Sequence, residues 1–128
     1  MLVTGQPVVN WVAEKMGAQF PGGHGLGLLR NERLVVGVVY ENITVDGCVM
    51  HIYSQDKFWF TKEFRSAAFH VPFVQWGLER VTAPVREDND TCWRFLEKTG
   101  WVHEGTLRGS RPTRIYGMLK SECRWLNG

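Results

Sequence analysis

Polar and hydrophobic positions in the first half of the chain follow two spacings that predict a helix and then strands. Residues 6–17 place apolar side chains on one helical face, with Pro7 in the first turn and Gly17 at the end. Three later runs have the composition of strands and are separated by turn residues at positions 31–32 and 46–47. We expect antiparallel strands at residues 25–30, 34–40 and 48–54, the second extended irregularly to Val45.

The middle of the chain predicts a long helix that contains a proline. Apolar side chains recur at helical spacing from Phe64 to Leu78, after a loop at residues 55–61. Pro72 lies inside this range, where a proline deletes one backbone hydrogen bond and clashes with the preceding turn. We therefore expect a bend near residues 68–71, followed by a strand at residues 80–85.

The stretch at residues 88–109 has the pattern of a capped helix followed by a strand. Asn89 or Asp90 can accept a hydrogen bond from a first-turn N–H, and Gly100 can adopt the left-handed conformation that ends a helix. The apolar stripe of this helix consists of Cys92, Phe95, Leu96 and Thr99. After it we expect strands at residues 101–103 and 114–119 and a short terminal helix at residues 120–126.

This order of elements places a strand–helix–strand crossover between two antiparallel regions. Such a crossover joins parallel neighbours, so the pattern predicts a mixed α/β sheet with helices on both faces. The glycine-rich segment at residues 19–27 leads into a strand, whereas a phosphate-binding loop must open a helix. We therefore expect this segment to cross the molecule on the substrate side and not to bind phosphate.

Composition narrows the class of protein without identifying its activity. With 128 residues, 44% of them hydrophobic and 22% charged, the chain is expected to form one globular domain over residues 1–128. The net charge of +2 is too small to indicate nucleic-acid binding by itself. Three widely spaced cysteines indicate free thiols, and no apolar run is long enough to span a membrane. We expect a cytoplasmic protein with no membrane contact.

Residues 89–108 resemble the acyl-CoA-binding half of the GNAT N-acetyltransferases. The resemblance is to the branch that contains the ribosomal-protein and spermidine acetyltransferases. It rests on Asn89, on Glu97-Lys98-Thr99-Gly100-Trp101 and on Glu104-Gly105-Thr106-Leu107-Arg108. It implies a GNAT-like fold with a shortened N-terminus, covering most of residues 34–119. It also implies transfer of an acyl group from acetyl-CoA to a primary amine of a small molecule, a protein or a nucleic-acid base.

The same resemblance implies where the co-substrate acetyl-CoA binds. In the family, the cleft lies between the strands that correspond here to residues 48–54 and 80–86. Backbone groups of the first strand pair with the pantetheine arm, and the start of the long helix faces the pyrophosphate. The expected binding residues are Ile52, Tyr53, Ser54, Lys57, Phe60, Thr61, Lys62, Asn89 and Phe95.

Two features of the sequence depart from the family pattern. The loop at residues 56–62 contains no glycine, although glycines usually let this loop close around phosphate. Leu96 stands where many members have the tyrosine that protonates the leaving thiolate, so the acid is another residue or water. Tyr116 and Tyr53 are the first candidates, followed by Ser54 and Thr91. His51 is the candidate base because histidine titrates near neutrality, and Glu41 is a base that would act through water.

Other interpretations of the sequence stay open. The aromatic loop and the chain's last residues resemble GNAT-like proteins of bacteriophages and prophages, some of which modify DNA bases. Arg108, Arg111 and Arg114, together with the aromatic residues 58–60, would suit such a nucleic-acid substrate, or form a solvated loop and a plug of the cleft. A non-catalytic protein that binds a host partner is the third interpretation. The aromatic content and Trp125 are also compatible with a homodimer.

Overall fold

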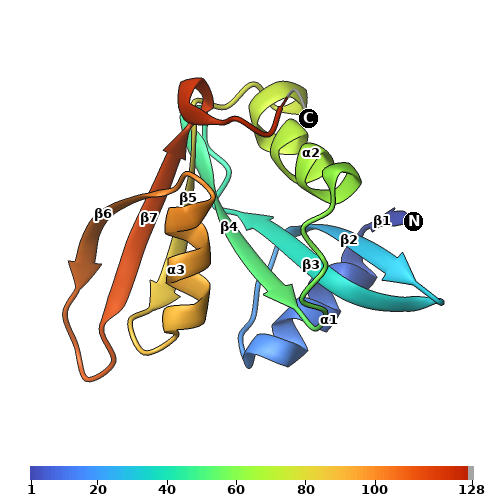
Figure 1. The fold of residues 1–128 in the computed structure, drawn as a ribbon, viewed down its shortest axis with the longest axis horizontal. Helices are drawn as coiled ribbons and strands as arrows, with labels where there is room; N and C mark the ends of the chain where they lie inside the picture. The colour runs from blue at the N-terminus through green and yellow to red at the C-terminus, as the bar shows by residue number, and fades with distance from the viewer. Residues whose placement is uncertain (127–128) are drawn as a thin grey trace.

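The computed structural model describes residues 1–126, which form one seven-stranded mixed sheet in the order β1-β2-β3-β4-β5-β7-β6 (Figure 1). Its strands are β1 (Leu2–Thr4), β2 (His24–Arg30), β3 (Arg33–Glu41), β4 (Gly47–Ser54), β5 (Arg80–Arg86), β6 (Val102–Leu107) and β7 (Thr113–Leu119). Its helices are α1 (Gln6–Met16), α2 (Lys62–His70) and α3 (Asp90–Lys98), with a π-helix at Val71–Gln75 and a 3-10 helix at Lys120–Glu122.

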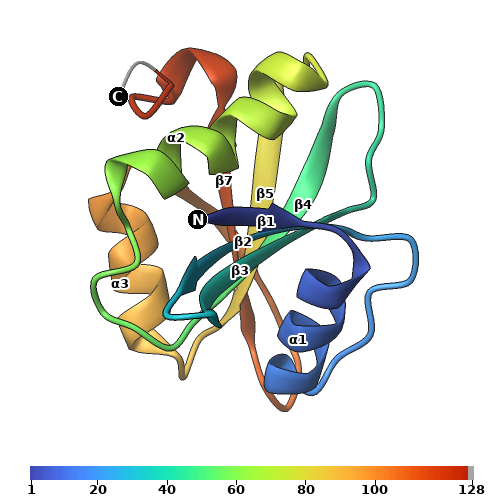
Figure 2. The ribbon, with the colours of Figure 1, turned by 90° about the vertical axis from the view of Figure 1, so that its right-hand side faces the viewer.

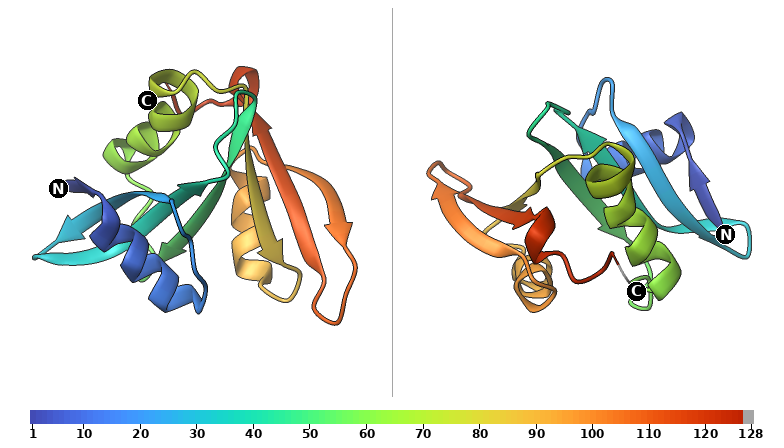
Figure 3. Two further views of the ribbon diagram at one scale, coloured as in Figure 1. Left: turned by 180° about the vertical axis from the view of Figure 1, so that it is seen from behind. Right: turned by 90° about the horizontal axis from the view of Figure 1, so that it is seen from above.

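The two faces of the sheet are covered by different helices, as the sequence predicted. The large core joins the sheet to α2 and α3 through side chains such as Phe64, Phe73 and Leu96. A smaller core on the opposite face joins α1 to β3 through Val12 and Val39. Figure 3 shows α1 and α3 on opposite sides of the sheet, and Figure 2 shows α2 on the side away from α1. The mixed α/β fold class predicted from the sequence is confirmed.

The meander and the crossover are confirmed, with two corrections near the ends of strands. Strands β2, β3 and β4 are antiparallel neighbours, and β4 and β5 are parallel. The predicted extension of the middle strand to Val45 is wrong, because β3 ends at Glu41. The Thr44 hydroxyl accepts hydrogen bonds from the Asp46 and Gly47 N–H groups and closes this turn. The segment Leu2–Thr4, which is too short for its pattern to predict an element, pairs with β2 as strand β1.

The predicted long helix changes character at its proline. α2 ends at His70, and the next five residues form a π-helix that begins one residue before Pro72. The Trp76 N–H donates to the Val71 carbonyl, five residues earlier, because Pro72 has no N–H with which to continue the α-helical pattern. The expected bend is therefore a local π-helix that ends at Gln75, after which Gly77 adopts a φ of +65°.

The predicted terminal helix at residues 120–126 is wrong, because only Lys120–Glu122 is helical. The following side chains bind the C-terminal end of α3 instead. Arg124 donates to the Lys98 carbonyl and the Trp125 indole N–H donates to the Thr99 carbonyl. These carbonyls lie at the end of α3 and have no partner within their own helix. The C-terminal segment therefore binds α3 through these hydrogen bonds and does not form a helix of its own. The strand predicted at residues 101–103 is longer than expected and runs from Val102 to Leu107.

Replacing Gly47 with alanine is expected to destabilise the protein by about 1–3 kcal/mol. Gly47 begins the short region where β4 and β5 pair, and a Cβ atom there would lie 2.7 Å from the Arg80 carbonyl oxygen. Backbone atoms cannot move aside without separating the two strands. Urea unfolding followed by fluorescence measures the change in the free energy of unfolding.

Gly105→Ala is the matched control for that substitution. Within the described chain, a Cβ atom at Gly105 would meet no atom within 4 Å, and this strand residue has no positive φ. Its expected effect is within about 0.5 kcal/mol. Equal effects of the two substitutions would contradict the close packing at Gly47.

Candidate active site

The sheet divides between β4 and β5, and this division is the central feature of the candidate site. The two strands pair through Gly47 with Arg80, Cys48 with Val81 and Val49 with Thr82, and the described pairing ends there. Figure 1 shows the two halves of the sheet diverging below this point. Pro84 lies in the diverging part of β5, where a residue without an N–H is tolerated because the neighbouring strand has moved away.

Two adjoining cavities occupy the space between the diverging strands. Both are lined by Ile52 of β4, by Asn89 and Cys92 at the start of α3 and by Leu96 further along this helix. The loop side of the cleft, of about 560 Å³, extends along β4 to residues 53–60. The α1 side, of about 330 Å³, extends to residues 16–20, His51 and residues 83–86. The predicted position of the cleft between these strands is confirmed, and Phe20 is the residue of the segment at 19–27 that lines it.

Asn89 is the N-cap of α3 and lines both sides of the cleft. Its side-chain oxygen accepts a hydrogen bond of 3.4 Å from the Cys92 N–H, which anchors the first turn. The Asn89 amide nitrogen is thereby left as a donor beside Ile52. The sequence predicted the cap from local pattern, and the structure adds that this cap lies in the cleft.

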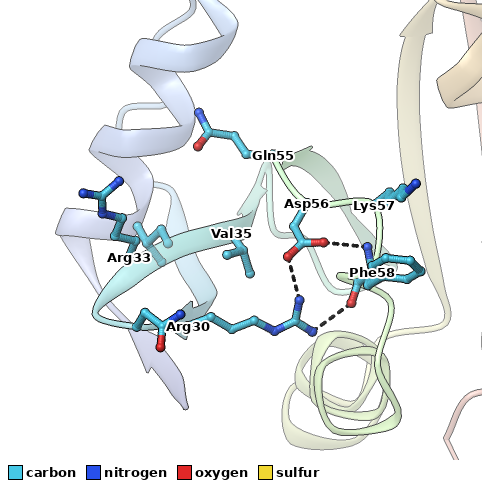
Figure 4. Close-up of a pocket in the computed structure, with 9 residues that line it drawn as sticks. Arg30, Arg33, Val35, Gln55, Asp56, Lys57 and Phe58 are labelled. Atoms are coloured by element: carbon cyan, nitrogen blue, oxygen red, sulfur yellow. Dashed lines mark hydrogen bonds and ion pairs between the residues drawn. The ribbon is translucent and has the colours of Figure 1, made fainter.

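The loop before α2 is fixed to the β2–β3 hairpin by a side-chain clasp (Figure 4). Arg30 donates to the Asp56 carboxylate and to the Phe58 carbonyl, each at 2.8 Å. The Phe58 N–H also donates to Asp56, at 2.8 Å. This N–H and the Arg30 guanidinium hold the pKa of the Asp56 carboxyl below its usual range. No local pattern in the sequence marks Arg30, which lies 26 residues away from its partner.

The clasp takes up one of the amides that a phosphate would use in a glycine-rich loop. A second loop amide, that of Thr61, donates to the Trp59 carbonyl. The Thr61 hydroxyl accepts from the Phe64 N–H and caps α2, so it stabilises the helix start. The N–H groups of Lys62 and Glu63 are the remaining first-turn donors of α2. Lys62 and Lys57 are exposed beside this helix start and the loop, respectively.

Aromatic side chains close the inner end of the loop side. The Trp59, Phe60 and Phe95 rings contact one another with centroid distances of 5.1–5.2 Å, and Phe60 also contacts Trp125. These rings are half-buried between α2, α3 and the C-terminal segment. Phe58 differs, because 70% of it is exposed. Two of the three loop aromatics therefore form a wall, and only Phe58 is free to stack on a ligand.

His51 and Glu41 form a close pair on the α1 side. The His51 Nε2 atom lies 2.6 Å from a Glu41 carboxylate oxygen, and the His51 ring packs on Phe20 at a centroid distance of 4.5 Å. Only 11% of the His51 side chain is exposed. Because a carboxylate accepts hydrogen bonds, Nε2 carries the proton and Nδ1 is the acceptor nitrogen. The sequence proposed these two residues separately, and the register of β3 and β4 brings them together.

The two candidate acids have different surroundings. Tyr53 lines the loop side of the cleft and packs edge-on against Trp11. Tyr116 is fully buried, and its hydroxyl donates to Glu97 at 2.6 Å and accepts from Arg114 at 3.2 Å. Burial and the hydrogen bond to Glu97 raise the pKa of Tyr116. Tyr116 is not among the residues that line either described side of the cleft.

The predicted basic cluster is largely neutralised. Arg114 lies within 3.7 Å of both Glu87 and Glu97, and its guanidinium is 3.8 Å from the centre of the Trp93 ring. Arg111 lies 3.6 Å from Asp88. Two of the three arginines therefore already have acidic neighbours, which weakens their expected role as a nucleic-acid contact.

Comparison with known proteins supports this description of the fold. No protein-family model matches the sequence, and a sequence search of curated proteins finds no match. Solved structures do match. A spermidine/spermine N-acetyltransferase of Vibrio cholerae is 13% identical, with a TM-score of 0.74 over 99% of this chain and 95% of the other. A T. thermophilus structure described as an acetyltransferase is 23% identical, with a TM-score of 0.68 over 80% of this chain and 61% of the other.

The chain has the GNAT acyltransferase fold. Another acetyltransferase structure, 23% identical with a TM-score of 0.69, matches 80% of this chain, which spans only 59% of that protein's length. The cavities between β4 and β5 lie where the family resemblance of the sequence predicted a cleft. No helix among residues 1–126 is long and apolar enough to cross a membrane.

Proposed function

We propose that this protein is an acyl-CoA-dependent N-acyltransferase that transfers an acetyl or similar acyl group directly to a primary amine. The observation that carries the proposal is the separation of β4 from β5 beside the capped start of α3. This separation leaves the backbone of β4 from Met50 onward without its β5 partner inside a cavity. An extended arm can pair with such a strand in the manner of an added strand.

The residues on the loop side fit the donor acetyl-CoA, which supplies the activated acyl thioester. The backbone of Ile52, Tyr53 and Ser54 would hold the pantetheine arm, together with the Asn89 amide nitrogen. Phe60 and Phe95 form the apolar wall behind it. Lys57, Lys62 and the first-turn N–H groups of α2 would bind the phosphates, and Thr61 supports them through its cap.

His51 and Glu41 supply the base on the α1 side. His51 accepts a proton from the acceptor ammonium at Nδ1, and Glu41 stabilises the resulting imidazolium through Nε2–H. The neutral amine nitrogen then forms a bond to the thioester carbon, and the carbon–sulfur bond breaks. The second proton of the amine leaves the new amide nitrogen and replaces the hydroxyl proton that the acid gives to the thiolate, so the acid ends the step protonated. We place the proton donor for the departing thiolate at Tyr53, because it lines the cleft. The predicted acid Tyr116 has its hydroxyl bound by Glu97 and Arg114, so we propose that it positions α3 against β7.

Isothermal titration calorimetry with acetyl-CoA and with CoA tests the proposal. Both are expected to bind, because the thiol arm and the phosphates are common to the two molecules. Binding of neither compound at millimolar concentration would overturn the proposed function.

Protection of Cys92 from alkylation is a second experiment, which locates the binding site. Cys92 lines both sides of the cleft, and burial raises the pKa of its thiol. CoA is expected to slow its reaction with iodoacetamide, as measured by mass spectrometry of peptides. Cys123 is the control, because burial also raises the pKa of its thiol but it does not line the described cleft. Equal protection of both cysteines would contradict the proposed site.

The loop itself favours a second candidate, a non-catalytic protein of the same fold that binds a partner. The Asp56 carboxylate accepts the Phe58 N–H, and the Thr61 N–H donates to the Trp59 carbonyl, so these amides are occupied within the loop. The Trp59 and Phe60 rings are packed into the domain. Failure to bind acetyl-CoA or CoA would favour this candidate. The DNA-modifying alternative is weakened by the ion pairs of Arg111 and Arg114. The structures named above give no support to a bacteriophage origin, and the homodimer stays a prediction.

A further inference from the structure

The α1 side of the cleft has an uneven charge distribution. Its lining includes apolar and small residues of the segment after α1, His51, and the end of β5. Arg86 is the Lys, Arg, Asp or Glu side chain that lines this described cavity, and its lining includes no carboxylate. A cavity of about 330 Å³ with a cation at its rim suits a small ligand that carries negative charge.

The acid beside His51 and the two acids that follow Arg86 in sequence are already paired with other groups. Glu41 binds His51 at 2.6 Å, Glu87 lies 3.7 Å from Arg114, and Asp88 lies 3.6 Å from Arg111. Arg86 is exposed, and within residues 1–126 it forms no ion pair. Its guanidinium is therefore not neutralised by the acids that follow it in sequence.

The backbone holds Arg86 in a defined place. It is the last residue of β5 and pairs with Thr113 of β7. Its carbonyl accepts the Asn89 N–H, which links it to the cap of α3 inside the cleft. A side chain that starts from a fixed strand end selects ligands more sharply than one on an unsupported loop.

A guanidinium group binds carboxylate and phosphate through paired hydrogen bonds and repels a second ammonium group. We propose that the acceptor is a small amine that also carries an anionic group, a carboxylate or a phosphate, and that Arg86 binds this group. The inference rests on the proposed acyltransferase function and names the acceptor class of the same site. It makes Arg86 a specificity-determining residue. It also distinguishes this protein from the spermidine acetyltransferases that share its fold, because spermidine is a polycation.

Matched amines test the charge of the acceptor. Release of CoA thiol is measured with β-alanine and β-alanine amide, with O-phosphoethanolamine and ethanolamine, and with spermidine. In the wild-type protein, the member of each pair that carries a carboxylate or phosphate is expected to have a kcat/KM at least about tenfold higher than the member that lacks this group. A preference for O-phosphoethanolamine over β-alanine identifies phosphate as the bound group, and the reverse identifies carboxylate.

The variant Arg86→Gln tests the assigned residue. It is expected to lower kcat/KM for the preferred anionic amine by about 10- to 100-fold, the loss of a hydrogen bond to a charged group, and to change the value for its neutral partner less than about twofold. Arg86→Lys is expected to restore part of the preference, because it keeps the charge. Arg108→Gln, which removes an exposed arginine that does not line the described cleft, is the control.

Several outcomes would overturn the assignment of Arg86 while leaving acetyl-CoA binding intact. One is a kcat/KM for spermidine, or for the amines without a carboxylate or phosphate, that equals or exceeds the value for the amines that carry such a group. Another is a decrease of kcat/KM in Arg86→Gln that is the same for amines with and without a carboxylate or phosphate. Binding of acetyl-CoA without acetylation of any anionic amine in the set would also overturn it. Absence of acetyl-CoA binding in calorimetry overturns the proposed function itself.

Discussion

Replacing His51 with alanine is expected to lower kcat/KM for acetyl transfer by about 10²- to 10⁴-fold, the usual contribution of a general base. The His51 ring is held between the Glu41 carboxylate and the Phe20 ring, so a small substitute cannot reproduce its position. Glu41→Gln is expected to lower the rate as well, because it removes the charge that stabilises the imidazolium. The rate of CoA thiol release at saturating acetyl-CoA measures both effects.

His24→Ala is the matched control for the His51 substitution. His24 is also a strand histidine next to an aromatic ring, Trp76 at 5.3 Å, but it does not line the described cleft. Its rate is expected to stay within about twofold of the wild type. The double variant of His51 and Glu41 is expected to lose little more than His51→Ala alone, because the two residues act as a unit. Additive losses, or an equal loss in His24→Ala, would contradict the catalytic pair.

Replacing Phe64 with alanine is expected to destabilise the protein by about 3–5 kcal/mol, a large part of the stability of a small domain. Phe64 is 0% exposed and lies in the first turn of α2, where its ring contacts Trp59 at 6.0 Å. Its removal would leave a cavity between α2 and the sheet. Urea unfolding measures this loss. Because the same turn begins at the Thr61 cap, acetyl-CoA binding is also expected to weaken.

Phe58→Ala, the control for this substitution, makes the same chemical change earlier in the chain. Phe58 is 70% exposed, so its removal is expected to change the free energy of unfolding by no more than about 0.5 kcal/mol. A loss below about 1 kcal/mol in Phe64→Ala, or an equal loss in the two variants, would show that the α2 core is packed differently.

Local signals in the sequence were sufficient to predict most of the helices and strands. Capping by Asn89 and the left-handed Gly100 fixed the bounds of α3, because both depend on neighbouring residues alone. Pro72 predicted a bend at residues 68–71, and the π-helix that replaces this bend begins at Val71. The prediction of a terminal helix failed for the opposite reason. Its residues have partners on α3, at Lys98 and Thr99, and these long-range hydrogen bonds outweigh a weak local preference.

The candidate site was predicted in outline. The cleft strands followed from the resemblance and from the crossover, and Pro84 is the local signal in β5 that would have located their separation. Sequence reasoning missed Arg30, Phe20 and Arg86, which contact or line the site from distant positions. No pattern near these residues marks them, because their partners are set by the packing of strands and loops.

The sequence by itself determined most of the order of elements and the mixed sheet, since these depend on periodicity, caps and the handedness of crossovers, and the position of the cleft followed from the family resemblance. Only the tertiary structure decided which side chains meet. It paired His51 with Glu41 through the β3–β4 register, and it closed the glycine-free loop with the Arg30–Asp56 clasp. It also paired Arg111 and Arg114 with acids and left Arg86 without one in the described chain. Such pairings depend on distances across the folded chain, which local sequence does not encode.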